Sequence, residues 1–198
     1  MLNRTSALFY KRAASPLMAL IPRIRAHLRQ GGVIAYATES CFGLGCDPRN
    51  FQAVRRILDI KGRTQSKGLI LVASDFNLLI PYLAPLSPDE LIKLDQMWPG
   101  PTTALIATKP STPNWLTGKH NTIAARVTAH TDTARLSHAL NMALVSTSAN
   151  RSGNIPYKQF QQCVKAFGDK VMVLPGRIGK RKRPSTILDL KSGKILRN

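Results

Sequence analysis

Residues 33–47 read VIAYATESCFGLGCD, an apolar run that changes abruptly into small polar residues and two closely spaced glycines. Val33 and Tyr36 favour a buried strand, because β-branched and aromatic side chains pack well on a pleated surface. Two hydroxyls and a carboxylate follow, and Gly43 and Gly45 permit positive φ or close approach to the backbone. Ligands of α/β proteins bind beyond such strand ends, so the stretch predicts either a ligand site or an ordinary glycine turn.

Composition sets the class of protein. The chain has 198 residues, of which 43% are hydrophobic, and its 29 Lys and Arg against 10 Asp and Glu give a formal charge of +19. Such an excess indicates an anionic partner such as phosphate, nucleic acid or an anionic surface. The three cysteines have no metal-ligand spacing and favour a reducing cytoplasm, so we expect a cytoplasmic protein without a metal site. No apolar run approaches the roughly 18 residues of a membrane span.

The N-terminal region divides into two parts. Residues 1–38 contain no acidic side chain, a bias that resembles an organellar transit peptide. From about residue 16, however, apolar residues recur at helical spacing, and Gly31-Gly32 provides a stop. We therefore predict a basic extension over residues 1–15 and a single domain over 16–198.

A cationic loop follows the next helix. Asn50 caps the segment NFQAVRRILDIK, and the loop GRTQSKG then leads into the strand LILVA. Lys61, Arg63 and Lys67 thus flank one short loop between a helix and a strand. Arg forks and Lys point charges bind phosphate oxygens in this way, although a solvated loop is the alternative.

Later segments repeat this organisation. Ser87 begins a helix with a capping box, and residues 75–83 and 157–167 are further helix candidates. Arg126 interrupts the strand TIAARV, where it must face solvent or meet an anion. ALVSTSAN ends a strand in hydroxyls and an amide, and five cations lie in the loop 176–184, which we expect to be mobile without ligand.

Six motifs together resemble one family. YATESCFGLGCDP is similar to a signature that usually reads (Y/F)PTET-x-(Y/F)GLG, and KGRTQSKGLILVA, WPGPTT, IAARV, STSAN-x-SG and PSTILD follow in the family's order. The chain is thereby similar to the YrdC-like threonylcarbamoyl-AMP synthases, in particular the short bacterial TsaC form, from about residue 17 onward. It departs from the pattern at Ala37, usually Pro, and at Ser40, usually Thr.

The resemblance implies a YrdC-like α/β fold, a twisted mixed sheet with helices and a concave basic face. It implies a nucleotidyltransferase that joins L-threonine, bicarbonate and ATP, the last bound with Mg²⁺, into threonylcarbamoyl-AMP and releases pyrophosphate. The product serves threonylcarbamoyladenosine modification of tRNA through partner proteins. The implied threonine ligands are Ser40, Arg126, Ser146 and Ser185; the ATP ligands are Arg63, Lys67, Thr122, Ser148 and Arg197; Lys61 and Arg63 are the implied catalytic residues. Glu39 is expected to hydrogen-bond its own turn rather than the threonine ammonium.

Two other functions remain open at this stage. A related domain forms carbamoyl-adenylate inside larger proteins, and the absence of flanking domains in this sequence argues against it. A double-stranded RNA-binding, tRNA-binding or ribosome-maturation module would also suit the charge, because charge alone does not separate RNA binding from ATP binding.

Overall fold

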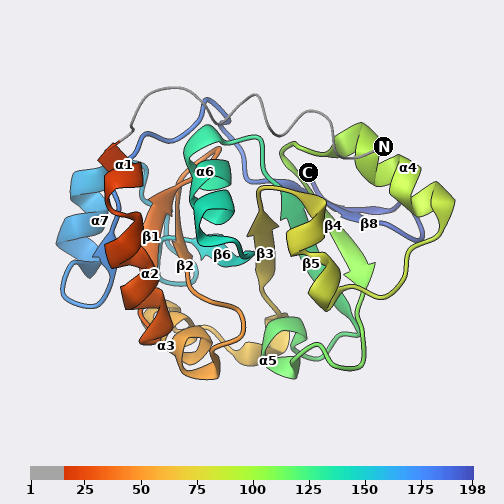
Figure 1. Ribbon diagram of the computed structural model, residues 1–198, viewed down its shortest axis with the longest axis horizontal. Coiled ribbons are helices and arrows are strands. Elements are labelled where there is room, and N and C mark those ends of the chain that lie inside the picture. Colours follow the sequence, from red (N-terminus) through yellow and green to blue (C-terminus); the bar gives the residue numbers. More distant parts are fainter. Residues whose placement is uncertain (1–15) are drawn as a thin grey trace.

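A computed structural model describes residues 16–198 of the chain, and the predicted extension 1–15 lies outside the described residues. The described residues form one mixed sheet of nine strands in the order β7-β1-β2-β6-β3-β5-β4-β8-β9, with helices packed around it (Figure 1). The strands are β1 (Ile34–Ala37), β2 (Phe42–Gly45), β3 (Ile70–Ala73), β4 (Thr102–Ala107), β5 (Thr122–Val127), β6 (Leu144–Ser148), β7 (Met172–Val173), β8 (Thr186–Asp189) and β9 (Ile195–Arg197). The predicted α/β class with a twisted mixed sheet is confirmed.

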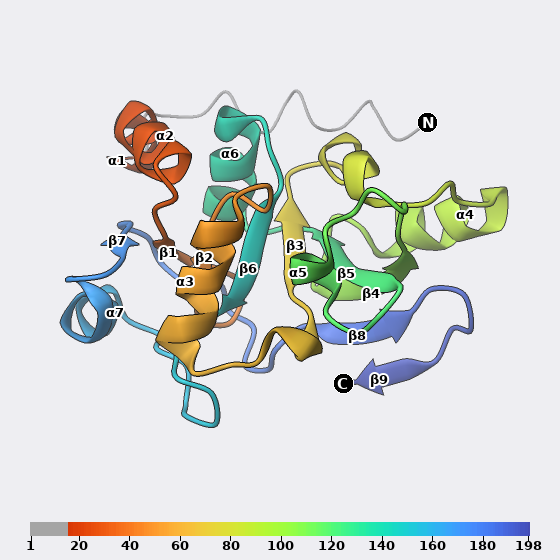
Figure 2. The same cartoon turned by 90° about the horizontal axis from the view of Figure 1, so that it is seen from below.

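Seven α-helices accompany the sheet in the described region. They are α1 (Pro16–Ala19), α2 (Ile21–Arg29), α3 (Phe51–Lys61), α4 (Pro88–Met97), α5 (Asn114–Thr117), α6 (Thr131–Leu140) and α7 (Phe160–Phe167). Figure 2 shows α7 and β7 at one end of the sheet and β8 and β9 at the other. None of the helices in residues 16–198 is long and apolar enough to cross a membrane.

Strand β1 shows how the sequence builds two hydrophobic layers. Ile34 and Tyr36 belong to a buried cluster that includes Leu136 of α6 and Ile24 of α2. Ala35, in contrast, belongs to the larger cluster that includes the buried face of α3. Since successive strand residues point to opposite faces, a strand buried on both sides reads as a continuous apolar run.

The glycines of the opening stretch lie in a strand, so close approach to the backbone, and not a turn, is the use that the structure shows for them. Gly43 and Gly45 lie in β2, which pairs antiparallel with β1, and the turn between the strands is at 38–41. There Thr38 donates both its backbone N–H and its hydroxyl to the carbonyl of Cys41, at 3.0 and 2.7 Å. A Cβ at Gly45 would lie 2.6 Å from the Tyr36 ring and from the Val145 carbonyl, so this glycine serves close packing.

The helix caps are as predicted from the sequence, whereas two of the predicted helices differ in the structure. Asn50 accepts a hydrogen bond from the backbone of Ala53, and Ser87 forms the predicted capping box. Segment 75–83 forms two short 3₁₀ turns (Phe76–Leu78 and Ile80–Tyr82) in place of a helix, and the second contains Pro81, which has no N–H to donate. The helix predicted over 157–167 begins only at Phe160.

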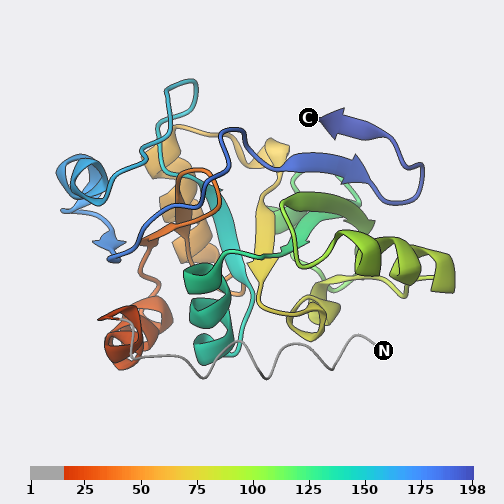
Figure 3. The ribbon, with the colours of Figure 1, turned by 90° about the horizontal axis from the view of Figure 1, so that it is seen from above.

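Residues 176–184, here called the cationic strap, lie in the segment that runs from β7 at one edge of the sheet to β8 near the opposite edge (Figure 3). They form neither helix nor strand, yet their backbone is attached to the 38–41 turn. The N–H of Gly179 donates to Thr38 at 2.9 Å, and the N–H of Arg181 donates to the carbonyl of Glu39 at 3.1 Å. The strap therefore follows the turn closely, and its predicted mobility without ligand stays a prediction.

Candidate active site

A cavity of about 480 Å³ lies where the 38–41 turn, the loop after α3, the ends of β5 and β6, the strap and β9 meet. Nine of the ten residues predicted for substrates line it. They are Ser40, Arg63, Lys67, Thr122, Arg126, Ser146, Ser148, Ser185 and Arg197. These residues span almost 160 positions of the sequence, and the sheet topology brings them to one space.

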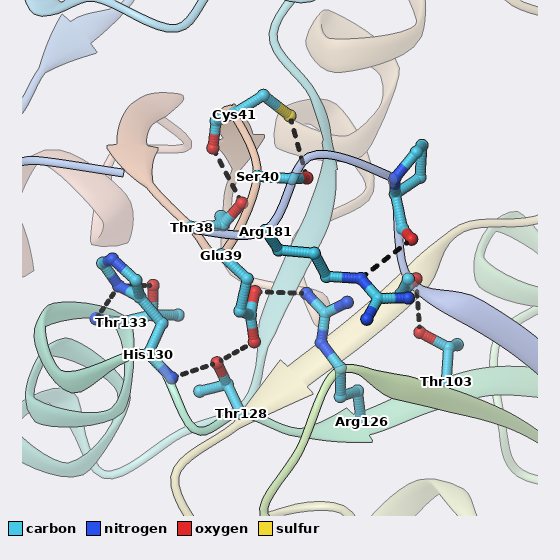
Figure 4. Close-up of polar contacts among 12 residues, drawn as sticks. Thr38, Glu39, Ser40, Cys41, Thr103, Arg126, Thr128, His130, Thr133 and Arg181 are labelled. Carbon is cyan, nitrogen blue, oxygen red and sulfur yellow. Dashed lines mark hydrogen bonds and ion pairs between the residues drawn. The ribbon is translucent and has the colours of Figure 1, made fainter. Parts of the chain in front are cut away.

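Arg126 of β5 is buried, with 7% of its surface exposed, and it meets an anion from its own chain. Its Nη2 lies 3.3 Å from Oε2 of Glu39, whose other oxygen accepts a 2.7 Å hydrogen bond from the Thr128 hydroxyl (Figure 4). The expectation that Glu39 hydrogen-bonds its own turn is therefore wrong, because its side chain reaches across to β5. Nε of Arg126 is buried and has no hydrogen-bond partner among the described residues, which leaves a donor for a ligand.

Ser185 is held in a single orientation at the start of β8. Its hydroxyl oxygen accepts from Thr103 at 2.9 Å and from Arg197 at 3.0 Å. Since both contacts can use the oxygen as acceptor, the proton of Ser185 remains free to be donated into the cavity. Burial, and secondly the charge of Arg126, lower the pKa of Arg197. An arginine stays protonated under these conditions, so the serine lies beside the cation of Arg197.

The ATP side predicted by the motifs lies at the loop after α3. Arg63 donates through Nη2 to the carbonyls of Gly68, at 2.8 Å, and Lys67, at 3.3 Å. These bonds fold the loop around the guanidinium, and burial lowers the pKa of Arg63. Its Nε is buried and unpartnered within residues 16–198. Arg63 and Lys67 thus present cationic donors to the cavity with no carboxylate beside them in the lining.

Lys61 is the predicted residue that does not line the cavity. It is 3% exposed, and its Nζ donates to Ser148 O at 2.5 Å, Asn150 O at 2.9 Å and Asn150 Oδ1 at 3.1 Å. Burial and, to a smaller extent, the charge of Arg63 lower its pKa to about 8. The lysine therefore supports the end of β6 from behind, and a direct substrate contact stays a prediction.

Sequence reasoning missed the residues that orient the ligands. Thr103 and Thr128 contact Ser185 and Glu39, yet they are ordinary strand residues in the sequence. Thr103 does lie in the WPGPTT motif, which is the signal that could have indicated it. Arg181 also lines the cavity, but it could not be distinguished from its four cationic neighbours.

The lining suits an anionic ligand better than a resident metal ion. Among the described lining residues, Glu39 is the one carboxylate, and it is already engaged with Arg126 and Thr128. No group of three or more His, Cys, Asp or Glu side chains within residues 16–198 has the geometry of a metal site. The cavity instead offers guanidinium, ammonium and hydroxyl donors, which are suited to phosphate and carboxylate oxygens.

Comparisons with known proteins agree with this chemistry. The model of the Sua5/YciO/YrdC family, described as "Telomere recombination", matches residues 26–198. The chain is 51% identical over 176 residues to the threonylcarbamoyl-AMP synthase of Thiobacillus denitrificans, covering 89% of this chain and 94% of the relative. It is 52% identical over 182 residues to the enzyme of that name from Chromobacterium violaceum, with coverages of 92% and 94%.

Two solved structures share the fold. Sua5 of P. abyssi in complex with L-threonine has a TM-score of 0.79 and 26% identity, covering 86% of this chain and 51% of Sua5. E. coli YciO has a TM-score of 0.79 and 24% identity, with coverages of 91% and 89%, and shows likeness of fold alone. From the family model and from relatives about half identical over nearly the whole described region, the chain belongs to the Sua5/YciO/YrdC family.

Proposed function

We propose that this protein forms threonylcarbamoyl-adenylate from L-threonine, bicarbonate and ATP, releasing pyrophosphate, and so supplies threonylcarbamoyladenosine modification of tRNA. The observation that carries the proposal is one cavity lined by hydroxyls, cations and a single carboxylate from distant motifs. The relatives named threonylcarbamoyl-AMP synthase support the same reaction. The enzyme is accordingly a nucleotidyltransferase with ATP as a substrate.

The amino-acid half of the cavity is assigned to Ser40, Arg126, Ser146 and Ser185. Arg126 offers its unpartnered Nε to the threonine carboxylate, and Ser185 offers its proton to an oxygen of the substrate. The nucleotide half is assigned to Arg63, Lys67, Thr122, Ser148 and Arg197, which all line the cavity. Lys61 acts at a distance, because all three of its acceptors belong to Ser148 and Asn150.

The reaction needs positioning and charge neutralisation more than a protein nucleophile. The threonine nitrogen bonds to the bicarbonate carbon with loss of water, and an oxygen of the resulting carbamate bonds to the α-phosphorus as pyrophosphate leaves. Charge develops on the pyrophosphate, and cations fixed in a dry site stabilise it. Mg²⁺ enters with ATP as part of the substrate and is held by its phosphates.

The orientation of Ser185 predicts recognition of the substrate hydroxyl. A site whose polar groups are fixed to pair with a hydroxyl leaves them unpaired when that group is absent, so valine should be rejected strongly. Serine lacks only the methyl group, which costs about 1–3 kcal/mol in a fitted pocket. We expect the order threonine, serine, valine in competition assays of adenylate formation, and equal use of valine would contradict the roles of these serines.

A pyrophosphate-release assay tests the proposal. The purified chain is given ATP, Mg²⁺ and bicarbonate, with threonine present or omitted, and the adenylate is identified by mass. Release that requires threonine supports the proposed function. Release with carbamoyl phosphate in place of threonine would indicate the carbamoyl-adenylate relative, and no release with either would indicate a non-catalytic module. Direct contact with tRNA, the receiving proteins and a cytoplasmic location stay predictions.

A further inference from the structure

Arg181 is the member of the cationic strap that turns inward. Its neighbours Lys180, Lys182 and Arg183 are exposed, whereas Arg181 is half-buried and lines the cavity. Figure 4 shows its side chain in the same space as Glu39 and Arg126. One cation of five in the strap is therefore directed to the site, and the others face solvent at the outer side.

The backbone fixes this direction. The N–H of Arg181 donates to the carbonyl of Glu39, and the N–H of Gly179 donates to Thr38, so the strap is attached to the 38–41 turn at two points. A Cβ at Gly179 would lie 2.7 Å from the carbonyl oxygen of Glu39, closer than real Cβ contacts. Only glycine lets the strap approach the turn this closely, and the approach places Arg181 over the cavity.

The guanidinium of Arg181 has acceptors but no counter-charge. Its Nε donates to the Pro184 carbonyl at 3.2 Å and its Nη2 to the Thr186 hydroxyl at 3.3 Å, both long bonds to neutral oxygens. No carboxylate of the described chain forms an ion pair with it. A half-buried guanidinium held in this way binds a bidentate anion at little cost in ordering, because its side chain is already positioned.

The charge balance of the cavity indicates which anion it binds. Five cationic side chains line the described cavity, namely Arg63, Lys67, Arg126, Arg181 and Arg197, against the single carboxylate of Glu39. Glu39 already neutralises Arg126, the cation of the amino-acid half. The remaining surplus exceeds what a zwitterionic amino acid can balance, whereas the triphosphate carries most of the negative charge of the three substrates.

From these observations we propose that Arg181 contacts the phosphates of ATP and the pyrophosphate that leaves, closing the nucleotide half of the site from the strap side. The identity of the ligand, ATP, rests on the proposed function, whereas the position of Arg181 in the cavity does not. When the bond from the α-phosphorus to the leaving oxygen breaks, negative charge grows on the pyrophosphate, and Arg181 stabilises that charge together with Arg63 and Lys67.

Binding measured without turnover tests the inference. MgATP and inorganic pyrophosphate are titrated into the wild-type chain and into Arg181→Ala, with Lys182→Ala as the control that removes the same charge from the exposed side of the strap. Loss of one charge-assisted contact should weaken both ligands about ten- to hundredfold in Arg181→Ala. Lys182→Ala should change them less than about threefold, and Arg181→Lys should lie between, because lysine keeps the charge without the fork.

A second variant separates position from charge. Gly179→Ala keeps every cation but displaces the strap from Glu39, so it should weaken MgATP binding while circular dichroism and the unfolding temperature stay near wild type. Equal losses in Arg181→Ala and Lys182→Ala would overturn the inference, as would a change confined to the KM for threonine. If the wild type binds MgATP, with Arg181→Ala weaker, but releases no pyrophosphate with threonine, the proposed function fails and the inference stands.

Discussion

Lys61 and Arg63 are two residues apart in the sequence, yet Arg63 lines the cavity and Lys61 does not. Lys61, the last residue of α3, is 3% exposed and directs its ammonium to carbonyl and amide oxygens behind the end of β6. Arg63 follows the left-handed Gly62 and lines the cavity in front. One helix end thus supplies one cation to the support of the site and another to the site itself.

The difference arises from the helix C-terminus and not from the spacing of the charges. Gly62 has φ of +58° and ends α3, so the chain reverses before Arg63. A K-x-R pattern alone suggests two equivalent phosphate ligands, whereas the backbone between them sends their side chains to different environments. The comparison predicts that substitution of Lys61 and substitution of Arg63 have different effects on stability and activity.

Arg63→Glu should give the largest effect, on activity. Loss of its charge-assisted contact with phosphate, together with a new repulsion, is expected to lower the rate of adenylate formation at least about hundredfold. Arg55→Glu, which makes the same charge change on the exposed face of α3, is the matched control and should stay within about threefold. Near-normal turnover of a folded Arg63→Glu protein would remove this loop from the active site.

Lys61→Met should differ by lowering stability as well as activity. The substitution keeps the apolar stem but leaves the Asn150 carbonyl without the ammonium donor, while the Asn150 amide oxygen keeps the Ser148 hydroxyl at 2.6 Å. A buried acceptor left unpaired costs about 1–3 kcal/mol, so the free energy of unfolding in urea should fall by that amount. Arg63→Met serves as comparison and should lose activity with a smaller loss of stability, because its two carbonyl acceptors are exposed or only partly buried. If both variants unfolded alike, the two cations would have equivalent structural roles.

The pH dependence of stability distinguishes the two residues further. Burial lowers the pKa of Lys61 to about 8 in the folded chain, whereas an unfolded lysine has a pKa of about 10.4. Between these values the unfolded chain binds more protons, so the free energy of unfolding rises with pH. The advantage of wild type over Lys61→Met should therefore grow by about 1.5 kcal/mol from pH 8 to pH 9.5 and become flat below about pH 7. A constant difference in urea titrations across this range would contradict the lowered pKa.

Much of the fold follows from local patterns in the sequence. The capped helix after Asn50, the capping box at Ser87 and the apolar strands were all predicted, because each depends on neighbouring residues. For the glycines at 43 and 45 the sequence left positive φ in a turn or close approach to the backbone open, and they lie in a strand that β1 and β6 approach closely. Which segments approach them is a tertiary fact that the local pattern does not identify.

The candidate site shows the same limit more sharply. Motifs indicated nine residues that do line the cavity, but they could not give the direction of Lys61 or the partner of Arg126. An unpaired arginine in a strand predicts an anion without saying whether a substrate or Glu39 provides it. Similarly, Arg181 differs from its neighbours only because Gly179 anchors the strap to the turn.

Gly62 offers the mildest test of the comparison, since it separates the two cations. A Cβ added there meets no atom within 4 Å, so Gly62→Ala introduces no clash and only the strain of a left-handed φ. We expect a loss of about 1 kcal/mol in the free energy of unfolding for alanine, and less for Gly62→Asn, because asparagine tolerates this conformation better. Both variants should keep Lys61 behind β6 and Arg63 in the cavity, and hence keep adenylate formation within about threefold of wild type. A large loss of activity in Gly62→Asn without a loss of stability would mean that glycine itself is needed beside the substrate. The different environments of Lys61 and Arg63 would then have another cause than the reversal of the chain at Gly62.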